Sequence, residues 1–551
     1  MYARALSAVL AVTLGGLAGC GDGDPRVERE PPVIIPPVEK FELPPLQRSV
    51  DSIELHVPAE ALARIAADPY TPEQAAEATY AGVRRPVMVR LRGGSSRWYP
   101  KRSWRVETVG TDRIDGRRKL NLVAEMADRT LVVEKLAFDL LLAMGAPAPR
   151  TRYVRLYVNG RFEGLYLDIE NVDRDFVLAH GFEDGDATVY RCGTQDCELK
   201  PFRWSYQGPW EKRTNEKEPW DDLEAFLAAV NRTPEPDFAR VIEQKLDVER
   251  YLRSMAMDAL ASNDIVMDSG SFLVADRVEG KWTYVPWDLN NSAARWWPTY
   301  GLGMQPIVDR PVPVFAVWDP RVQFFFDRRN PGDGSAYYPA FSNLTTRVFQ
   351  QPAFRERLAR ILEKALDELF APAVIDARLE AMHALVAPWV EQDPYVNLTT
   401  DGAADPDGLA KFRASLAYTK AYVRGRAEFL RAEIPRWRAW RPALVLASFD
   451  PARGEVEIAN RGDAPVSTEG LVLTDDARRS TVANLPARTL APGATARFGP
   501  ADHGLSFTAA GEVALFDGRT LFGAHDLLFY GPLEAGRVYA RAGDGGGWIV
   551  R

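Results

Sequence analysis

One hairpin pattern, in residues 271–285, constrains the fold of this 551-residue chain more than any other stretch. Both halves of the pattern are rich in β-forming residues, and residues 276–280 between them supply turn residues, which predicts a β-hairpin. Antiparallel pairing brings the residues before the first strand beside those after the second. We therefore expect Asp264 and Asp268 to approach Asp288, where carboxylates can hold a divalent cation or move protons.

Length and composition indicate a globular protein of roughly three domains. The chain is 46% hydrophobic and 26% charged, so it can bury sizeable cores. Its formal net charge of -8 is spread over both signs without long blocks of one charge. This distribution gives no support for binding to a nucleic-acid backbone.

The first twenty residues have the pattern of an export signal, with one early Arg and a short apolar run that is too brief to span a membrane. Their ending, LAGC, resembles a bacterial lipobox, which implies lipidation at Cys20 and a membrane anchor made of acyl chains. An ordinary signal peptide is the alternative. Gly21 after the Cys favours the outer membrane or the cell surface, and residues 21–48 predict a Pro-rich extended tether.

The remaining cysteines, Cys192 and Cys197, stand five positions apart. In an exported protein this spacing favours a small structural disulfide over a metal pair or a redox centre. The chain has five His and neither an HExxH nor a CxxC motif, so zinc has little support and oxygen ligands are expected for any metal.

Two neighbouring strand patterns carry basic residues around a loop of Gly and Ser. Arg90 and Arg92 share one face of the first strand, and Lys101 shares a face with Arg105 on the second. If these faces align, they form a cationic surface that can hold phosphates together with the loop, including Ser96. A solvated outer face is the alternative, and periodicity does not separate the two.

Other periodic segments outline the rest of the fold. Residues 127–145 predict a helix, and Asn159-Gly160 predicts a second hairpin, with Glu170 near the end of its second strand. Further helices are expected over residues 353–370, 371–390 and 411–433. Beyond residue 435, short alternating runs between Gly, Pro and Asp turns predict a β-sandwich.

Several motifs, in order, resemble the spore coat protein H (CotH) kinase family over about residues 50–435. They read VRLRGGSSRWYPKRSW, RLYVNGRFEGLYLDIENVD, SNDIVMDSGSFLVAD and KWTYVPWDLN. The resemblance implies an α+β fold with an atypical protein-kinase-like, two-lobed domain. It also implies use of ATP with Mg²⁺ or Mn²⁺ and phosphorylation of Ser in proteins.

The resemblance also suggests roles for individual residues. Asp264 matches the catalytic carboxylate and Asp288 the metal-binding Asp, with Asn290 at a further ligand position. The hairpin pattern adds Asp268 as a candidate metal ligand. The residues expected to bind the nucleotide are Arg90, Arg92, Ser96, Lys101 and Glu170, and Glu170 has an adenine-side or structural role. The family usually has Asp where this chain has Asn290, and the lost charge should weaken Mg²⁺ binding.

These patterns together predict four parts: a signal (1–20), a tether (21–48), a CotH kinase-like domain (49–436) and an all-β immunoglobulin-like sandwich (441–551). The sandwich resembles the lamin-tail domain, which implies a docking module for a surface partner. The predicted function is an exported, lipid-anchored kinase that acts on Ser or Thr of surface or envelope proteins. The alternative is a non-catalytic envelope protein that binds protein or polysaccharide.

Overall fold

The computed structural model describes most of the chain, and residues 38–551 form one compact unit that follows residues 1–37. The described residues are 39–193, 199–202, 206–261, 271–293, 343–475, 482–517, 525–542 and 547–551. The fold is α+β, as predicted. Among the described helices, none combines the length and the apolar character needed to cross a lipid bilayer.

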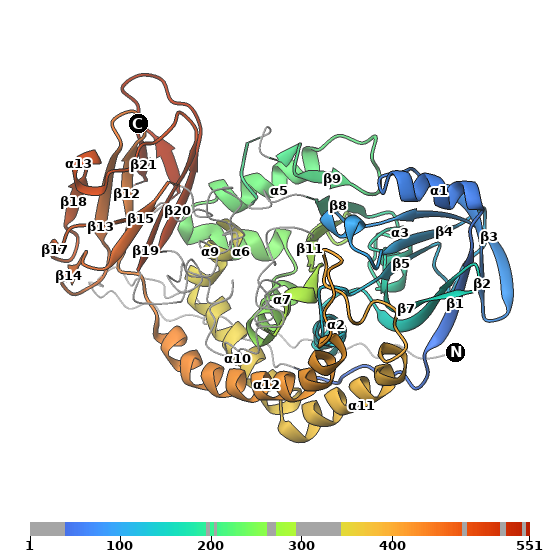
Figure 1. Ribbon diagram of the computed structural model, residues 1–551. Helices are drawn as coiled ribbons and strands as arrows, with labels where there is room; N and C mark the ends of the chain where they lie inside the picture. The colour runs from blue at the N-terminus through green and yellow to red at the C-terminus, as the bar shows by residue number, and fades with distance from the viewer. Residues whose placement is uncertain are drawn as a thin grey trace, which may run out of the picture. The chain divides into compact units, whose positions relative to one another are not determined.

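Seven strands near the N-terminal side of this unit close into a barrel, drawn in blue to teal in Figure 1. Around the barrel they are β1 (Asp51–His56), β2 (Gln74–Tyr80), β3 (Val83–Leu91), β4 (Trp104–Thr108), β5 (Lys119–Val123), β7 (Arg161–Glu170) and β6 (Thr151–Val158). All neighbours are antiparallel except β1 and β6, whose parallel pairing closes the ring. Alternate side chains point inward, so Ile53, Leu55, Val87 and Val89 share one buried core.

Both predicted hairpins are present. β6 and β7 are joined through Asn159 and Gly160, which have φ angles of 49° and 78°. Positive φ at both turn positions is what a two-residue hairpin turn requires, and Asn and Gly tolerate it best. The second hairpin joins β10 (Phe272–Asp276) to β11 (Lys281–Val285) in antiparallel register.

The second hairpin belongs to a four-stranded sheet in the order β11-β10-β8-β9, with β8 at Thr188–Cys192 and β9 at Trp210–Lys212. Its aromatic side chains pack on helices, and the ring centroid of Trp282 lies 4.9 Å from that of Phe226. The nearby helices are α3 (Arg174–Ala179), α5 (Asp221–Arg232), α6 (Glu235–Lys245) and α7 (Val248–Ala261).

Helix α2 (Val133–Ala143) is shorter than the helix predicted over residues 127–145. Leu131 has a φ angle of 57°, which a right-handed helix does not allow. The hydroxyl of Thr130 accepts hydrogen bonds from the backbone N–H groups of Val132 and Val133. Helix α2 therefore begins at Val133, after Thr130 and Leu131, and not at residue 127, where the predicted helix starts.

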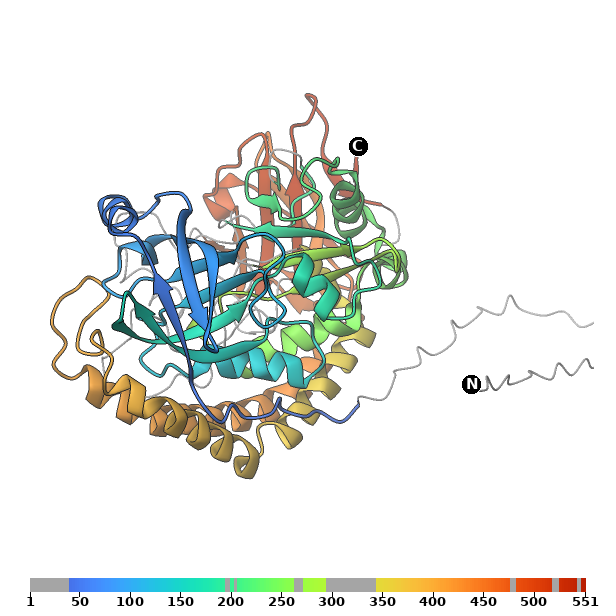
Figure 2. The same cartoon turned by 90° about the vertical axis from the view of Figure 1, so that its right-hand side faces the viewer.

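Long helices complete the larger core and run along the lower edge of Figure 2 in yellow and orange. They are α10 (Pro352–Glu368), α11 (Pro372–Val390) and α12 (Gly408–Ala439), accompanied by the shorter α1 (Ala59–Ala67) and α9 (Asn343–Gln350) elsewhere in the fold. The three long helices match the predicted segments to within a few residues, except that α12 extends further at both ends.

Beyond α12 the described chain is almost entirely β. One sheet contains β18 (Thr495–Phe498), β13 (Glu455–Asn460), β12 (Leu444–Asp450), β21 (Tyr539–Arg541) and β22 (Trp548–Val550). A second sheet contains β16 (Val482–Asn484), β15 (Leu471–Thr474), β19 (Gly511–Asp517) and β20 (Asp526–Tyr530). The smaller elements of this region are β14 (Val466–Ser467), β17 (Thr489–Leu490) and α13 (Pro500–His503). Buried residues of both sheets form one hydrophobic core. The boundaries at residues 436 and 441 and the immunoglobulin-like topology stay predictions.

Candidate functional site

A cavity of about 560 Å³ is bounded by the barrel strands β3, β4 and β5 and by the sheet that contains β8 and β10. It is strongly basic, although the chain as a whole has a net charge of -8. Its charged wall residues are seven basic and two acidic ones: Arg90, Arg92, Arg97, Lys101, Arg105, Arg191, Arg213, Glu125 and Asp288. The excess of guanidinium groups makes this cavity suited to an anion that carries several negative charges.

Six of the predicted site residues line this cavity: Arg90, Arg92, Ser96, Lys101, Asp288 and Asn290. The strand faces align as expected, because the register of β3 and β4 places Arg90 directly opposite Arg105. Asp264, Asp268, Cys197 and Cys20 lie outside the described residues. Cys192 forms a disulfide bond, and its pairing with Cys197 stays a prediction.

Asp288 follows the β10–β11 hairpin and comes just before a short 3₁₀ turn, η2 (Leu289–Asn291). Its backbone is left-handed, with a φ angle of 60°, a conformation that costs free energy in most residues and is often kept at functional sites. Burial raises the pKa of Asp288, and the charges of Arg92 and Arg191 partly oppose this rise. Asp288 thus places a carboxylate within reach of two guanidinium groups.

Of the two arginines that act electrostatically on Asp288, Arg92 has the larger effect. Burial lowers its pKa to about 10, while the negative charges of Glu134 and Asp288 favour the protonated form. Its guanidinium carbon lies 5.8 Å from the centroid of the Trp287 ring, a cation–π distance. Because a pKa of about 10 is well above neutrality, Arg92 keeps its charge in the cavity at pH 7.

Glu125 and Glu134 form a pair of buried carboxyl groups beside Asp288. Burial raises the pKa of Glu125 well above its usual range, and the charge of Glu134 raises it further. Burial also raises the pKa of Glu134 to about 7, although its Oε1 accepts a hydrogen bond of 3.1 Å from the backbone N–H of Leu289. Both side-chain oxygens of Glu125 are buried without a hydrogen-bond partner.

Sequence reasoning did not assign a role to this carboxyl pair. The available signal was Glu134, a charge within the apolar face of α2, where a carboxylate is costly unless it has a function or a partner. Glu125 follows β5 in a stretch without a periodic pattern, and its φ angle is 49°. Nothing in its immediate sequence marks it.

Ser96 belongs to the loop after β3 and lies in η1 (Ser95–Trp98). The preceding Gly93 has a φ angle of 105°, and a Cβ atom at that position would lie 2.1 Å from the Ser96 hydroxyl oxygen. The Ser96 hydroxyl can rotate away from such an atom, but a φ angle of 105° is strained for any residue that has a Cβ atom. The conformation of this loop therefore favours Gly93.

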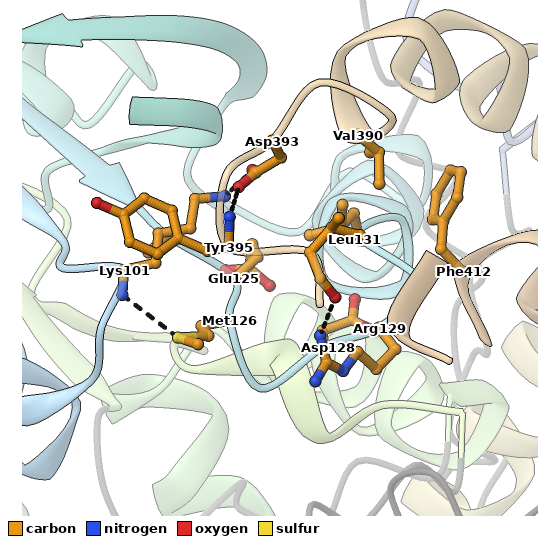
Figure 3. Close-up of a pocket in the computed structure, with 13 residues that line it drawn as sticks. Lys101, Glu125, Met126, Asp128, Arg129, Leu131, Val390, Asp393, Tyr395 and Phe412 are labelled. Carbon is orange, nitrogen blue, oxygen red and sulfur yellow. Dashed lines mark hydrogen bonds and ion pairs between the residues drawn. The ribbon is translucent and has the colours of Figure 1, made fainter. Parts of the chain in front are cut away.

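Lys101 directs its ammonium group toward Asp393 in a second, smaller pocket of about 30 Å³ (Figure 3). Its Nζ atom lies 2.7 Å from Oδ2 of Asp393 and 2.6 Å from the carbonyl oxygen of Leu165. It also lies 4.9 Å from the Tyr166 ring centroid. The ammonium is thus occupied within the protein, and its expected contact with a nucleotide phosphate stays a prediction.

Glu170 does not line the large cavity. Its carboxylate accepts hydrogen bonds from Arg150 and faces a ring nitrogen of His180 at 2.8 Å. Burial alone would raise the pKa of Glu170, but the hydrogen bonds from His180 and Arg150 outweigh it and lower the pKa to about 2. These contacts fit the structural alternative for Glu170 better than the adenine-side one.

Oxygen atoms near Asp288 are of the type that Mg²⁺ prefers. The donors are the Asp288 carboxylate, the Asn290 side-chain carbonyl and the unpartnered oxygens of Glu125. No three His, Cys, Asp or Glu side chains in the described part of the chain converge into a complete metal-binding group. This donor set suits Mg²⁺ bound by one or two carboxylates together with the phosphates of a substrate.

Comparison with known proteins gives a consistent assignment. The chain is 24% identical over 353 residues to inner spore coat protein H of Bacillus subtilis, covering 63% of this chain and 86% of the relative. It is 26% identical over 173 residues to invasin CotH2 of Rhizopus delemar, covering 30% of this chain and 29% of that relative. The model of the CotH kinase protein family matches residues 89–430, which contain the whole basic cavity. The chain belongs to the CotH kinase protein family.

Proposed function

We propose that this chain is a protein kinase that transfers the γ-phosphoryl group of ATP to Ser or Thr of proteins. The basic cavity is the observation that carries the proposal, because it combines an excess of Arg with the Asp288 carboxylate. Phosphoryl transfer depends mainly on positioning and on stabilising charge that spreads over the phosphate oxygens. The family name and the expected two-lobed kinase-like fold are consistent with this chemistry.

In this proposal the chain's own residues hold the nucleotide. Arg92 neutralises phosphate charge deep in the cavity, where its partial burial strengthens electrostatic interactions. The backbone around Gly93 and Ser96 approaches the phosphates closely, because no side chain at Gly93 intervenes. Asp264, in the catalytic role that the family resemblance implies, orients the acceptor hydroxyl and takes up its proton.

A divalent cation would be held by Asp288 and Asn290, with Glu125 close by. When bound, Mg²⁺ or Mn²⁺ would neutralise charge on the phosphate oxygens. Glu125 and Glu134 favour their protonated forms when the cavity holds no cation, because both are buried beside another carboxyl group. A cation there would favour their ionised forms, so nucleotide and metal binding should release protons.

The test is incubation of the full chain with γ-labelled ATP and Mg²⁺ or Mn²⁺, using a mixture of Ser-containing proteins as acceptors. We expect label transfer and a rise in melting temperature with ATP, and both should be lost in Asp288→Ala. Arg240→Gln is the matched control, since Arg240 lies on α6, is 63% exposed and pairs with Asp237. Absence of both transfer and a thermal shift would reject the kinase proposal.

A non-catalytic binding protein is the second candidate. Two observations favour it: Asn290 carries no charge at a cavity position where the family usually has Asp, and the Lys101 ammonium is paired with Asp393. In this case the same fold would bind protein or polysaccharide partners. A thermal shift with ATP that is not accompanied by label transfer to any acceptor would support this second candidate.

We further propose that the protein is exported and anchored to the cell envelope through a lipid on Cys20. Its relative in Bacillus is named a spore coat protein, which is consistent with a surface-associated role. The two sheets beyond α12 would form a lamin-tail-like domain that binds a surface partner. Metabolic labelling with a fatty acid, compared between the natural chain and Cys20→Ala, tests the anchor.

A further inference from the structure

Four arginines at the outer part of the cavity form a group of their own. They are Arg90 on β3, Arg105 on β4, Arg191 on β8 and Arg213 directly after β9, and we call them the outer arginine cluster. Two different sheets therefore contribute to the cluster. Arg90 and Arg105 are direct cross-strand partners, an arrangement in which like charges destabilise a sheet.

The positive charges of the cluster lie close enough to repel one another. Burial lowers the pKa of Arg105, and the charges of Arg90 and Arg213 lower it further. Burial likewise lowers the pKa of Arg191, and Arg213 adds to the effect. Bringing these like charges together destabilises the folded protein, and an anion bound at the cluster would relieve the repulsion.

Carboxylates near the cluster do not fill the cavity. The carboxylate of Glu73 lies 3.4 Å from Arg90, that of Glu107 lies 3.4 Å from Arg105, and that of Glu211 lies 3.1 Å from Arg213. None of these three glutamates lines the cavity. They hold the arginine side chains from outside and leave the cavity wall cationic.

Two members keep unused hydrogen-bonding capacity. The Nε atom of Arg105 is buried and has no hydrogen-bond partner. The Arg191 side chain has neither a hydrogen bond nor an ion pair with any residue in the described ranges, although it is partly buried. A buried donor without a partner is costly, so a ligand oxygen at this place would be stabilising.

The cluster adjoins the proposed transfer site and is distinct from it. Arg191 interacts electrostatically both with Asp288 and with Arg105 and Arg213, so it links the two regions. In the proposed transfer site the nucleotide phosphates would be held by Arg92, which interacts electrostatically with Glu134 and Asp288, and by the loop around Ser96. The outer cluster therefore adds positive charge to a less buried part of the cavity than the part that holds Asp288.

We propose that the outer arginine cluster binds acidic side chains next to the phosphorylated Ser or Thr, so that the substrates are acidic protein segments. This inference rests on the proposed kinase function. A single guanidinium group can donate two parallel hydrogen bonds to the two oxygens of a carboxylate, so several arginines can bind several acidic side chains. The Arg105 and Arg213 side chains are only 11% and 30% exposed within a concave wall, so a flexible peptide reaches them more readily than a flat membrane surface does.

The test uses three fluorescent peptides that differ only around a central Ser: flanks of Glu, of Gln or of Lys. Binding to the full chain is followed by anisotropy without ATP, and label transfer is followed with ATP. We expect the Glu peptide to bind at least about tenfold more tightly than the Gln peptide. The double variant Arg105→Gln/Arg213→Gln should bind the Glu peptide about tenfold more weakly than the natural chain does. The Arg240→Gln variant should bind the Glu peptide as tightly as the natural chain.

Folding of each variant is checked by its melting temperature, and Arg191→Gln serves as a second, independent test of the cluster. Equal binding of the Glu and Gln peptides, or a preference that survives both sets of substitutions, overturns the inference. Binding of phosphatidylserine vesicles in place of the Glu peptide, with the same dependence on Arg105, overturns it as well.

Failure of this inference differs from failure of the proposed kinase function. If label reaches the Gln and Glu peptides equally, the chain is a kinase and the acidic-substrate inference is wrong. If the Glu peptide binds through the cluster but no label is transferred under any condition, the kinase proposal fails and the acceptor-side role fails with it.

Discussion

The Nζ atom of Lys101 lies 2.7 Å from Oδ2 of Asp393, a residue 292 positions later in the chain, and both side chains are buried. Asp393 also accepts hydrogen bonds from the backbone N–H groups of Leu165 and Tyr395. The pair thus fixes the segment after α11 to the edge of the barrel. A buried pair of this kind is costly to break, because the remaining charge loses its partner.

Asp393→Ala should lower the free energy of unfolding by about 3–5 kcal/mol, because it leaves the Lys101 ammonium buried and uncompensated. Urea unfolding monitored by Trp fluorescence measures the loss. The matched control is Glu391→Gln, two positions earlier, whose partner Arg413 is 61% exposed. That substitution should cost less than about 1 kcal/mol. The double variant Lys101→Met/Asp393→Leu should regain much of the stability, and equal losses in all three variants would contradict the expectation.

Asn290→Asp should lower the Mg²⁺ concentration needed for half-maximal ATP-dependent activity by about tenfold, or about 1.4 kcal/mol. The added carboxylate supplies a hard anionic ligand at the cavity wall. Asn484→Asp makes the same change in charge at an exposed position on β16 and should leave the Mg²⁺ dependence unchanged. If both variants behave like the natural chain, Asn290 does not contact the cation.

Glu134→Gln should flatten the pH dependence of stability between about pH 4.3 and 7. The pKa of Glu134 is about 7 in the folded protein, whereas in the unfolded chain it is about 4.3. The folded state therefore binds more protons in this interval, and the free energy of unfolding falls as the pH rises through it. Glu125, Asp288 and Arg92 face the same group and are left unchanged in the variant.

The measurement is urea unfolding of both proteins at pH 5 and pH 8 without nucleotide or divalent cations. We expect the natural chain to lose about 1–3 kcal/mol more than the variant between these values. Parallel pH curves would show that Glu134 titrates normally in the folded state.

Glu170→Gln should lower the free energy of unfolding, and the loss should be largest at neutral pH. The pKa of Glu170 is lowered to about 2 in the folded state, so its ionised form stabilises the fold above about pH 4.3. That contribution is lost as the pH falls toward 2. The variant should be less stable by about 2 kcal/mol at pH 7, and the difference should shrink in acid. A constant difference at every pH would contradict the assignment.

Local patterns predicted the elements that neighbouring residues determine. The Asn159-Gly160 turn and the β10–β11 hairpin follow from turn chemistry and alternation, and the Arg90–Arg105 alignment follows from the face pattern of two adjacent strands. The expected meeting of Asp264 with Asp288 stays a prediction, because Asp264 lies outside the described residues.

Contacts between distant segments were not predictable from these patterns. Glu125 and Glu134 meet because a loop after β5 and the first turn of α2 face one another, and no periodicity records that. Arg191 and Arg213 reach the cavity from another sheet, and each looks like an ordinary strand or loop charge in the sequence. The partner of Lys101 was missed for the same reason.

The separation of 292 positions between Lys101 and Asp393 bears on how the chain acquires its fold during synthesis. Domains generally begin to fold from the N-terminal end while the ribosome is still extending the chain. A barrel that closes at that stage holds Lys101 without its carboxylate until Asp393 has emerged. The nascent barrel should therefore stay loosely packed around this lysine, and helix α11 must be synthesised before the barrel edge reaches its final stability.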